Sequence, residues 1–266
     1  MKVAVTGASG FVGRALCKAL AVAGHEVLGV DLRRDGFPRA EAVVHLAAIA
    51  HRAASAPELE RVNVALARQV GVLAAAQGAS LVFLSSVKVH GEASTVAFSE
   101  NSPMAPQDAY GASKARAEEA LRGLPGLRLA VLRPPLVYGP GVKANFLALM
   151  KAISRGWPLP LASVRNARSL VYVGNLVDAI LGCLGRDATF LVSDGAPVST
   201  PGLCGEIGRA LGRPARLFPF PTAWLPAKVA ASLELDDSAI RRAHGWHPPF
   251  TLEQGLGETA RWYRGR

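Results

Sequence analysis

Residues 2–13 read Lys2-Val3-Ala4-Val5-Thr6-Gly7-Ala8-Ser9-Gly10-Phe11-Val12-Gly13, and this stretch decides the fold. Its apolar start predicts a short buried strand, and the helical spacing of apolar residues from Phe11 to Val22 predicts an amphipathic helix closed by Gly24. The three glycines suit a tight turn, a close approach of pyrophosphate and packing of the helix on the strand. The first N–H groups of such a helix point toward bound phosphate. The pattern therefore predicts a dinucleotide site that includes Gly7, Gly10, Phe11, Val12 and Gly13.

An acidic residue, Asp31, ends the second expected strand at Glu26 to Val30. A carboxylate there accepts hydrogen bonds from the adenosine ribose and repels a 2′-phosphate, which favours NAD over NADP. Arg33 and Arg34 follow directly, and they would compensate a phosphate if they face it. The sequence prefers NAD and leaves NADP open.

Further strands are expected at residues 42–46, 81–84 and 127–132, with helices at 57–76 and 109–121. This alternation predicts an α/β fold, a Rossmann-type doubly wound parallel sheet. Only residues 32–41 join the second strand to the third, fewer than a helical crossover needs. Ten extended residues reach roughly 33 Å, enough to return along a strand and cross two strand spacings. We expect one shortened strand-helix unit, with the Asp31 strand at or near a sheet edge.

The chain is expected to divide near Pro140, after which prolines and loops multiply. Residues 1–140 would form the NAD(P)-binding domain and 141–266 mainly a small substrate-binding lobe, with 169–193 returning to the first domain. Residues 169–173 and 190–192 look like isolated strands. Ligands of open α/β sheets bind at the carboxyl ends of the strands, which the lobe would cover.

Composition narrows the function classes further. Half of the 266 residues are hydrophobic, yet no apolar run reaches the length of a membrane span, and no signal-peptide pattern precedes the first strand. A cytoplasmic protein without membrane association is expected. The three cysteines have no disulfide or metal-ligand spacing, so no metal is expected. The formal charge of +10 comes from scattered arginines and lysines without interleaved aromatic residues, which argues against nucleic-acid binding.

Tyr110 and Lys114 stand four residues apart at the start of an expected helix, so they share one face. A neighbouring ammonium and a positive nicotinamide ring would lower the pKa of the tyrosine phenol. The phenol could then exchange a proton with a substrate oxygen while hydride moves to or from the cofactor. Ser86, just after a buried strand, could hydrogen-bond the same oxygen.

Together these motifs resemble the extended short-chain dehydrogenase/reductases, in particular the NAD-dependent epimerase/dehydratase family that acts on nucleotide sugars. The resemblance covers nearly the whole chain. It is carried by residues 6–13, Asp31, His45-Leu46-Ala47-Ala48, Asn63-Val64, Ser85-Ser86-Val87-Lys88-Val89-His90-Gly91, Tyr110-Gly111-Ala112-Ser113-Lys114 and Leu132-Arg133-Pro134-Pro135-Leu136-Val137-Tyr138-Gly139-Pro140-Gly141.

The resemblance implies a role for each matching residue. Ser86, Tyr110 and Lys114 would be catalytic, and Tyr110 and Lys114 would also contact the cofactor. On the substrate side it implies Ser86, Lys88, Asn145 and Arg168, where the arginine would pair with a diphosphate. From the residues alone, Arg168 is equally a solvated loop charge and Asn145 a cap of the following helix. Leu46, Ala47, Ala48, Asn63 and Pro134 would border the cofactor.

Three segments (86–92, 139–146 and 168–176) look most like a branch with reductases of 4-keto-6-deoxy nucleotide sugars, often labelled 4-epimerases. We therefore expect reduction of a 4-keto group on a nucleotide-linked hexose in polysaccharide precursor synthesis, with 4-epimerisation as the alternative. A dehydratase is disfavoured because Val87 stands where elimination usually recruits an acid. Such proteins commonly pair through two helices, so a homodimer is expected. His90 replaces a more usual tyrosine and is either a substrate contact or structural. A non-catalytic dinucleotide sensor or scaffold is the rival class.

Overall fold

The computed structural model describes residues 1–32, 36–50 and 54–266. Its centre is a six-stranded parallel sheet in the order β2-β1-β3-β4-β5-β8. The fold predicted from the sequence is therefore confirmed, and β2 lies at one edge as its short connection required. The strands are β1 (Lys2–Thr6), β2 (Glu26–Val30), β3 (Ala42–His45), β4 (Ser80–Leu84), β5 (Leu129–Arg133) and β8 (Ala188–Leu191).

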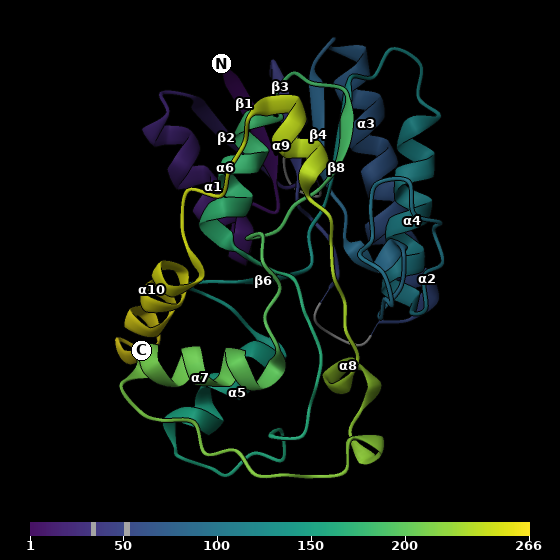
Figure 1. The fold of residues 1–266 in the computed structure, drawn as a ribbon. Helices are drawn as coiled ribbons and strands as arrows, with labels where there is room; N and C mark the ends of the chain where they lie inside the picture. The colour runs from purple at the N-terminus through teal and green to yellow at the C-terminus, as the bar shows by residue number, and fades with distance from the viewer. Residues whose placement is uncertain (33–35, 51–53) are drawn as a thin grey trace.

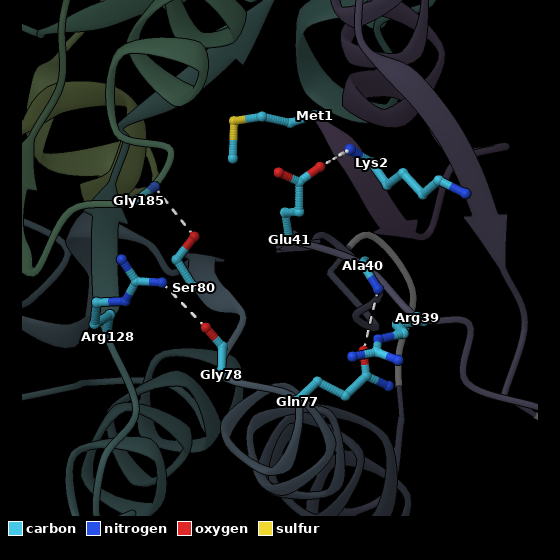
Figure 2. A pocket seen from close by; sticks show the side chains of 10 residues that line it. All are labelled: Met1, Lys2, Arg39, Ala40, Glu41, Gln77, Gly78, Ser80, Arg128 and Gly185. Atoms are coloured by element: carbon cyan, nitrogen blue, oxygen red, sulfur yellow. Dashed lines mark hydrogen bonds between the residues drawn. The ribbon is translucent and has the colours of Figure 1, made fainter.

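Hydrogen bonds hold the end of the short connection where it enters β3. Figure 2 shows the Glu41 carboxylate accepting from the Lys2 backbone N–H at 2.7 Å. The side-chain oxygen of Gln77 accepts from the Ala40 N–H at 3.1 Å. The pocket drawn there lies at the amino ends of the strands, as its lining residues Lys2 and Ser80 show. It therefore lies at the opposite end of the strands from the glycine turn, which follows the carboxyl end of β1.

Helices cover both faces of the sheet because every buried strand offers apolar side chains alternately to each side. Val3 and Val5 join the core beneath α1 (Phe11–Val22) and α6 (Val173–Gly182). Ala4, between them, joins the core beneath α3 (Leu66–Ala76) and α4 (Ala109–Arg122). Figure 1 shows the two helix layers on either side of the strands.

The helical run expected at 57–76 is present but is not one regular helix. It consists of α2 (Ala56–Leu59), a π-helical turn at Glu60–Ala65 and α3. π-helical turns are rare and occur mostly where a side chain must be placed for function. Here the turn carries the buried Asn63.

A smaller group of elements lies below the sheet in the view of Figure 1. β6 (Leu136–Tyr138) and β7 (Leu170–Tyr172) pair in parallel, and α5 (Ala144–Ser154), α7 (Thr200–Leu211), α8 (Ala227–Ala230) and α10 (Leu252–Arg264) pack nearby. The remaining short helices are η2 (Val87–Val89), η3 (Thr222–Trp224) and α9 (Ser238–His244). In the described part of the chain, no helix is both long and apolar enough to cross a membrane.

The two segments expected as isolated strands are in fact paired. β7 pairs with β6, and β8 forms the sixth strand of the main sheet beside β5. Leu191 at the end of β8 is fully buried. The expectation of isolated strands was wrong because the partners of these short segments are distant in the sequence, outside any local pattern.

Candidate active site

The glycine turn has the geometry that the sequence predicts. Gly7 has a φ of +70°, a conformation that favours glycine, and a Cβ there would lie 2.9 Å from the Ala47 nitrogen. A Cβ on Gly13 would lie 2.2 Å from the Gly7 carbonyl oxygen. A side chain at Gly7 would therefore clash with the loop after β3, and a side chain at Gly13 would force α1 away from the glycine turn.

The start of α1 fits a dinucleotide diphosphate. Gly10 precedes the helix and provides no side-chain cap to its first N–H groups, so these groups and the positive end of the helix dipole suit an anion. Arg14, one turn into the helix, donates to the Ser9 carbonyl at 2.7 Å and adds a guanidinium beside the turn. Its place one turn after the glycines is a signal that the sequence offers, because a cation there lies beside the diphosphate cradle.

The loop after β3, with Leu46, Ala47 and Ala48, crosses directly over the glycine turn. The Ala47 N–H donates to the Thr6 hydroxyl at 3.4 Å. Asn63 fastens the far side of this loop because its side-chain oxygen accepts from the Ile49 N–H at 2.8 Å, while its amide donates to the Ser113 hydroxyl at 2.9 Å. Asn63 is fully buried, so it links this loop to α4.

A histidine that the sequence analysis gave no role supports the same region. His45 is 1% exposed, its Nδ1 lies 2.7 Å from the Thr6 hydroxyl, and its ring stacks on Phe83. Burial, aided by the Lys114 charge, lowers the pKa of the imidazole to about 3. His45 is therefore neutral near pH 7 and fixes the ends of β1 and β3 without adding charge.

Ser86, Tyr110 and Lys114 come together where β4 meets the first turn of α4. Tyr110 is the second residue of α4, and Ser86 follows β4. Burial, together with the Asp108 carboxylate, raises the pKa of the Tyr110 phenol, while a hydrogen bond with Ser86 acts in the opposite direction. The phenol therefore carries its proton near pH 7.

A close backbone approach produces this juxtaposition. A Cβ on Gly111 would lie 2.6 Å from the Lys88 carbonyl oxygen, so only glycine lets α4 pack against the turn after Ser86. Asp108 caps α4 by accepting from the Gly111 N–H at 2.6 Å, and it also accepts from the Lys88 ammonium at 2.5 Å. The cap and the ion pair hold the serine turn and the tyrosine helix together.

Lys114 lies behind this pair in an almost fully buried position. The residue is 2% exposed. Its ammonium donates to the Leu84 carbonyl at 2.7 Å and lies 4.5 Å from the centre of the Phe83 ring. Burial lowers the pKa of the ammonium to about 7, and the Glu118 carboxylate acts to raise it. Shifts of this kind concentrate at functional sites.

One turn further along α4, a buried ion pair supports the site from below. Glu118, with no exposed surface, accepts from Arg133 at 2.6 and 3.0 Å and from the Ser85 hydroxyl at 2.5 Å. The Arg133 guanidinium also lies 3.0 Å from His90 Nε2. His90 is 3% exposed and stacks on Phe98, so of its two expected roles the structural one fits its contacts.

Two cations expected on the substrate side, Lys88 and Arg168, lie within the electrostatic influence of the same carboxylate, Glu92. Lys88 pairs with Glu92 at 2.5 Å. Burial lowers the pKa of the Arg168 guanidinium, and the same Glu92 carboxylate acts to raise it. Arg168 is partly buried and donates to the Ala231 carbonyl at 2.9 Å. Its burial and this hydrogen bond do not fit the alternative interpretation of Arg168 as a solvated loop charge.

Asn145 does not cap α5, because the capping position is Lys143 and Asn145 is an exposed residue inside the first turn. That alternative was wrong. The preceding residue, Ala144, has a φ of +51°, and such strained backbone in a non-glycine residue concentrates at ligand sites. Pro134 is buried at the end of β5, and its carbonyl accepts from the Val87 N–H at 2.9 Å.

Asp31 lies at the carboxyl end of β2 and is partly buried. It has interactions of its own within the protein. Arg33 and Arg34, on which the NADP alternative depends, lie outside the described residues.

The sheet order, the glycine turn and the tyrosine–lysine helix define a Rossmann-type dinucleotide-dependent enzyme. The model of the "NAD dependent epimerase/dehydratase family" matches residues 3–42 and 35–190. The chain belongs to this family. Family and enzyme class, as expected from the sequence, are confirmed, and NAD is the cofactor of the family.

Known proteins similar to the chain agree with this family assignment. A UDP-glucose 4-epimerase of Vibrio cholerae is 34% identical, with 96% of this chain and 93% of the relative covered. An N-acetyl-α-D-glucosaminyl-diphospho-ditrans,octacis-undecaprenol 4-epimerase of Escherichia coli O157:H7 is 27% identical over 97% and 93% of the two chains. A solved structure of the Bordetella bronchiseptica enzyme WbmG in complex with NAD has a TM-score of 0.85 at 22% identity, covering 100% of this chain and 94% of that one. This last likeness concerns the fold.

Proposed function

We propose that the protein is an NAD-dependent enzyme that moves hydride at C4 of a hexose joined to a nucleoside diphosphate, and that its reaction is 4-epimerisation. The observation that carries the proposal is the Ser86–Tyr110 pair, set above the buried Lys114 beside the glycine turn. A protonated phenol paired with a serine is suited to exchange a proton with a substrate oxygen.

Each member of the group has a distinct task. Tyr110 Oη exchanges the proton of the substrate C4 oxygen, and Ser86 Oγ holds that oxygen in line. Lys114 provides a positive charge that stabilises the phenolate form of Tyr110 and contacts the nicotinamide ribose. Bound NAD supplies the hydride acceptor and donor.

The cofactor contacts are proposed from position. Gly7, Gly10, Phe11, Val12 and Gly13 form the diphosphate cradle at the start of α1, and Asp31 at the end of β2 faces the adenosine ribose. This arrangement supports NAD over NADP. Tyr110 and Lys114 on α4 are proposed to contact the cofactor, and Asn63 bonds to Ser113 of the same helix. Leu46, Ala47, Ala48 and the buried Pro134 are proposed to border it as well.

The substrate contacts lie between the sheet and the elements below it. Ser86, Lys88, Asn145 and Arg168 are proposed to hold the sugar and its diphosphate, with residues 141–266 mainly forming the substrate lobe and 169–193 returning to the 1–140 domain. Asn145 is exposed beside the strained Ala144. Glu92 pairs with Lys88 and acts electrostatically on Arg168. Arginine suits this task because its planar fork binds phosphate in a bidentate manner.

Net reduction of a 4-keto sugar is the second candidate. It is favoured by the motif resemblance at 86–92, 139–146 and 168–176. Two less similar relatives also carry reductase names, a ceramide reductase of Caulobacter vibrioides and a 2-alkyl-3-oxoalkanoate reductase of Stenotrophomonas maltophilia. Both reactions share the same half-reaction, so the same side chains would serve either.

The test is to incubate the purified protein with NAD and UDP-glucose and to follow the sugar by proton NMR. Appearance of UDP-galactose without net change in NADH, together with NAD retained through purification, supports epimerisation. Stoichiometric oxidation of NADH by a 4-keto nucleotide sugar supports reduction. Bound NAD with neither reaction across UDP- and dTDP-linked sugars would favour a dinucleotide sensor.

We also propose a cytoplasmic homodimer that pairs through α3 and α4. The exposed Val72 on α3, with 42% of its surface accessible, supports this pairing. Sedimentation equilibrium of the protein and of a Val72→Glu variant tests it, with a twofold drop in mass expected for the variant.

A further inference from the structure

Four aromatic residues, which we call the aromatic edge, line one side of the substrate lobe: Trp157, Phe218, Phe220 and Trp224. Trp224 is 77% exposed, Trp157 54% and Phe218 41%. Large aromatic side chains left this open to water are unusual, because each normally buries most of its surface. In Figure 1 the chain between α7 and α8, which carries three of them, runs along the lower border of the molecule.

The aromatic edge is a built part of the fold. Leu159 pairs with Leu217, and the Phe218 N–H donates to the Leu159 carbonyl at 3.0 Å. The Phe220 N–H donates to the Ser163 hydroxyl at 3.1 Å, and the Phe220 ring meets the Trp224 ring edge to face. These bonds join residues 157–163 to residues 216–224, so the aromatic side chains belong to one continuous surface.

The charge of the surrounding sequence has a single sign. Residues 141–177 and 210–233 contain no aspartate or glutamate. They contain eight basic residues: Lys143, Lys151, Arg155, Arg165, Arg168, Arg213, Arg216 and Lys228. The Arg155 guanidinium lies 5.2 Å from the Trp157 ring, and Arg213 donates to the Ser154 carbonyl beside it. At least one of these cations, Arg155, therefore lies directly beside an exposed aromatic ring.

We propose that the aromatic edge docks the protein on an anionic phospholipid bilayer. Exposed tryptophan and phenylalanine enter the boundary between headgroups and acyl chains, and lysine and arginine pair with the anionic headgroups. The exposed prolines between the rings, Pro219 and Pro221, suit an acyl boundary better than nucleobases. This proposal departs from the expectation of no membrane association, which rested on the absence of a long apolar run, because an interfacial surface needs no spanning helix.

The aromatic edge is connected to the proposed substrate site through the segment that follows Trp224. The segment that carries Trp224 continues to Ala231, whose carbonyl accepts from Arg168. Arg168 is the residue proposed to hold the substrate diphosphate. Docking would thus bring Arg168 and the proposed substrate site close to the bilayer, although the docking itself does not depend on the proposed reaction.

The experiment is flotation of the full chain with vesicles of equal phosphatidylglycerol and phosphatidylcholine, and with vesicles of phosphatidylcholine alone. The protein should float with the anionic vesicles and much less with the neutral ones. Trp224→Ser should weaken partitioning roughly tenfold, because half-burying an indole removes on the order of 60 Å² from water. Arg216→Gln and Lys228→Gln should each weaken it about fivefold.

Matched variants on α1 serve as controls. Val22→Ser removes an apolar side chain that is 83% exposed, and Lys18→Gln removes an exposed charge; both should float like the wild type. Circular dichroism and turnover of a soluble nucleotide sugar without vesicles show that each variant is folded.

Three results would overturn the proposal. The first is a wild type that does not float with anionic vesicles, and the second is equal flotation of Trp224→Ser. The third is a Trp224→Ser variant that changes only the sedimenting mass or the binding of single-stranded RNA, which would assign the surface to another partner.

Discussion

Replacing Lys114 by methionine should stabilise the free protein near neutral pH, although it removes a proposed catalytic group. Burial lowers the pKa of this ammonium from 10.5 to about 7. Between these two values the unfolded chain binds more protons than the folded chain at this site. Stability of the wild type must therefore rise with pH through this window, and the cost of burying the charge is complete only below pH 7.

The two pKa values set the size of the effect. They correspond to a cost of about 5 kcal/mol at pH 6 and about 1.5 kcal/mol at pH 9.5. Methionine removes this cost but leaves the Leu84 carbonyl without its donor, which costs about 1–3 kcal/mol at every pH. Lys114→Met should therefore gain about 2–4 kcal/mol at pH 6, and this gain should fall by about 3 kcal/mol by pH 9.5.

Urea unfolding followed by circular dichroism, from pH 6 to pH 9.5, measures this directly. Other titrating groups cancel when the variant is compared with the wild type at each pH. Lys18→Met, at an exposed position on α1, is the control and should show a small difference without pH dependence. A difference between Lys114→Met and the wild type that stays constant across the range would refute the buried, perturbed ammonium.

Four further outcomes are expected. Tyr110→Phe should lose nearly all turnover yet bind NAD in a thermal-shift assay, and substantial remaining activity would remove the phenol from the mechanism. Glu118→Gln should lower the free energy of unfolding in urea by about 3–5 kcal/mol because it leaves Arg133 buried and unpaired. The double variant Glu118→Gln with Arg133→Met should recover much of that loss. A loss below 1 kcal/mol for the single variant would contradict the buried ion pair. Arg168→Gln should raise the KM for a nucleotide sugar about 10-fold to 100-fold through a lost charged contact, and an unchanged KM would exclude a diphosphate contact. Gly13→Ala should abolish NAD binding in calorimetry because its Cβ would lie 2.2 Å from the Gly7 oxygen. Gly182→Ala, at a helical glycine with free space around it, is the control and should leave binding intact.

Patterns within short stretches of the sequence predicted those parts of the fold that depend on neighbouring residues in the chain. The alternation of strands and helices gave the parallel sheet, and the length of the connection 32–41 placed β2 at the edge. The sequence analysis expected residues 169–193 to return to the first domain, but it did not predict the pairing of Ala188–Leu191 with β5, because this is a contact between distant segments. The π-helical turn at Asn63 was missed for a related reason, since its geometry depends on contacts with Ile49 and Ser113.

The candidate site shows the same division. The spacing of Tyr110 and Lys114 is visible in the sequence, because four residues on a helix share a face. The burial that perturbs Lys114 is not visible, since it depends on Phe83, Leu84 and Glu118 from different segments. Asn145 was open to interpretation as a helix cap because the strained Ala144 that starts α5 has no sequence signature.

In the proposed reaction hydride, and not a proton, leaves and returns at C4 of the sugar. A nucleotide hexose deuterated at C4, incubated with the holoenzyme in ordinary water, distinguishes these two possibilities. Hydride transfer should give slower turnover than with the unlabelled sugar and deuterium carried by the nicotinamide, so that it returns to C4 in an epimerase. Deuterium lost from C4 to the solvent, with no transient reduction of NAD, would exclude hydride transfer at C4.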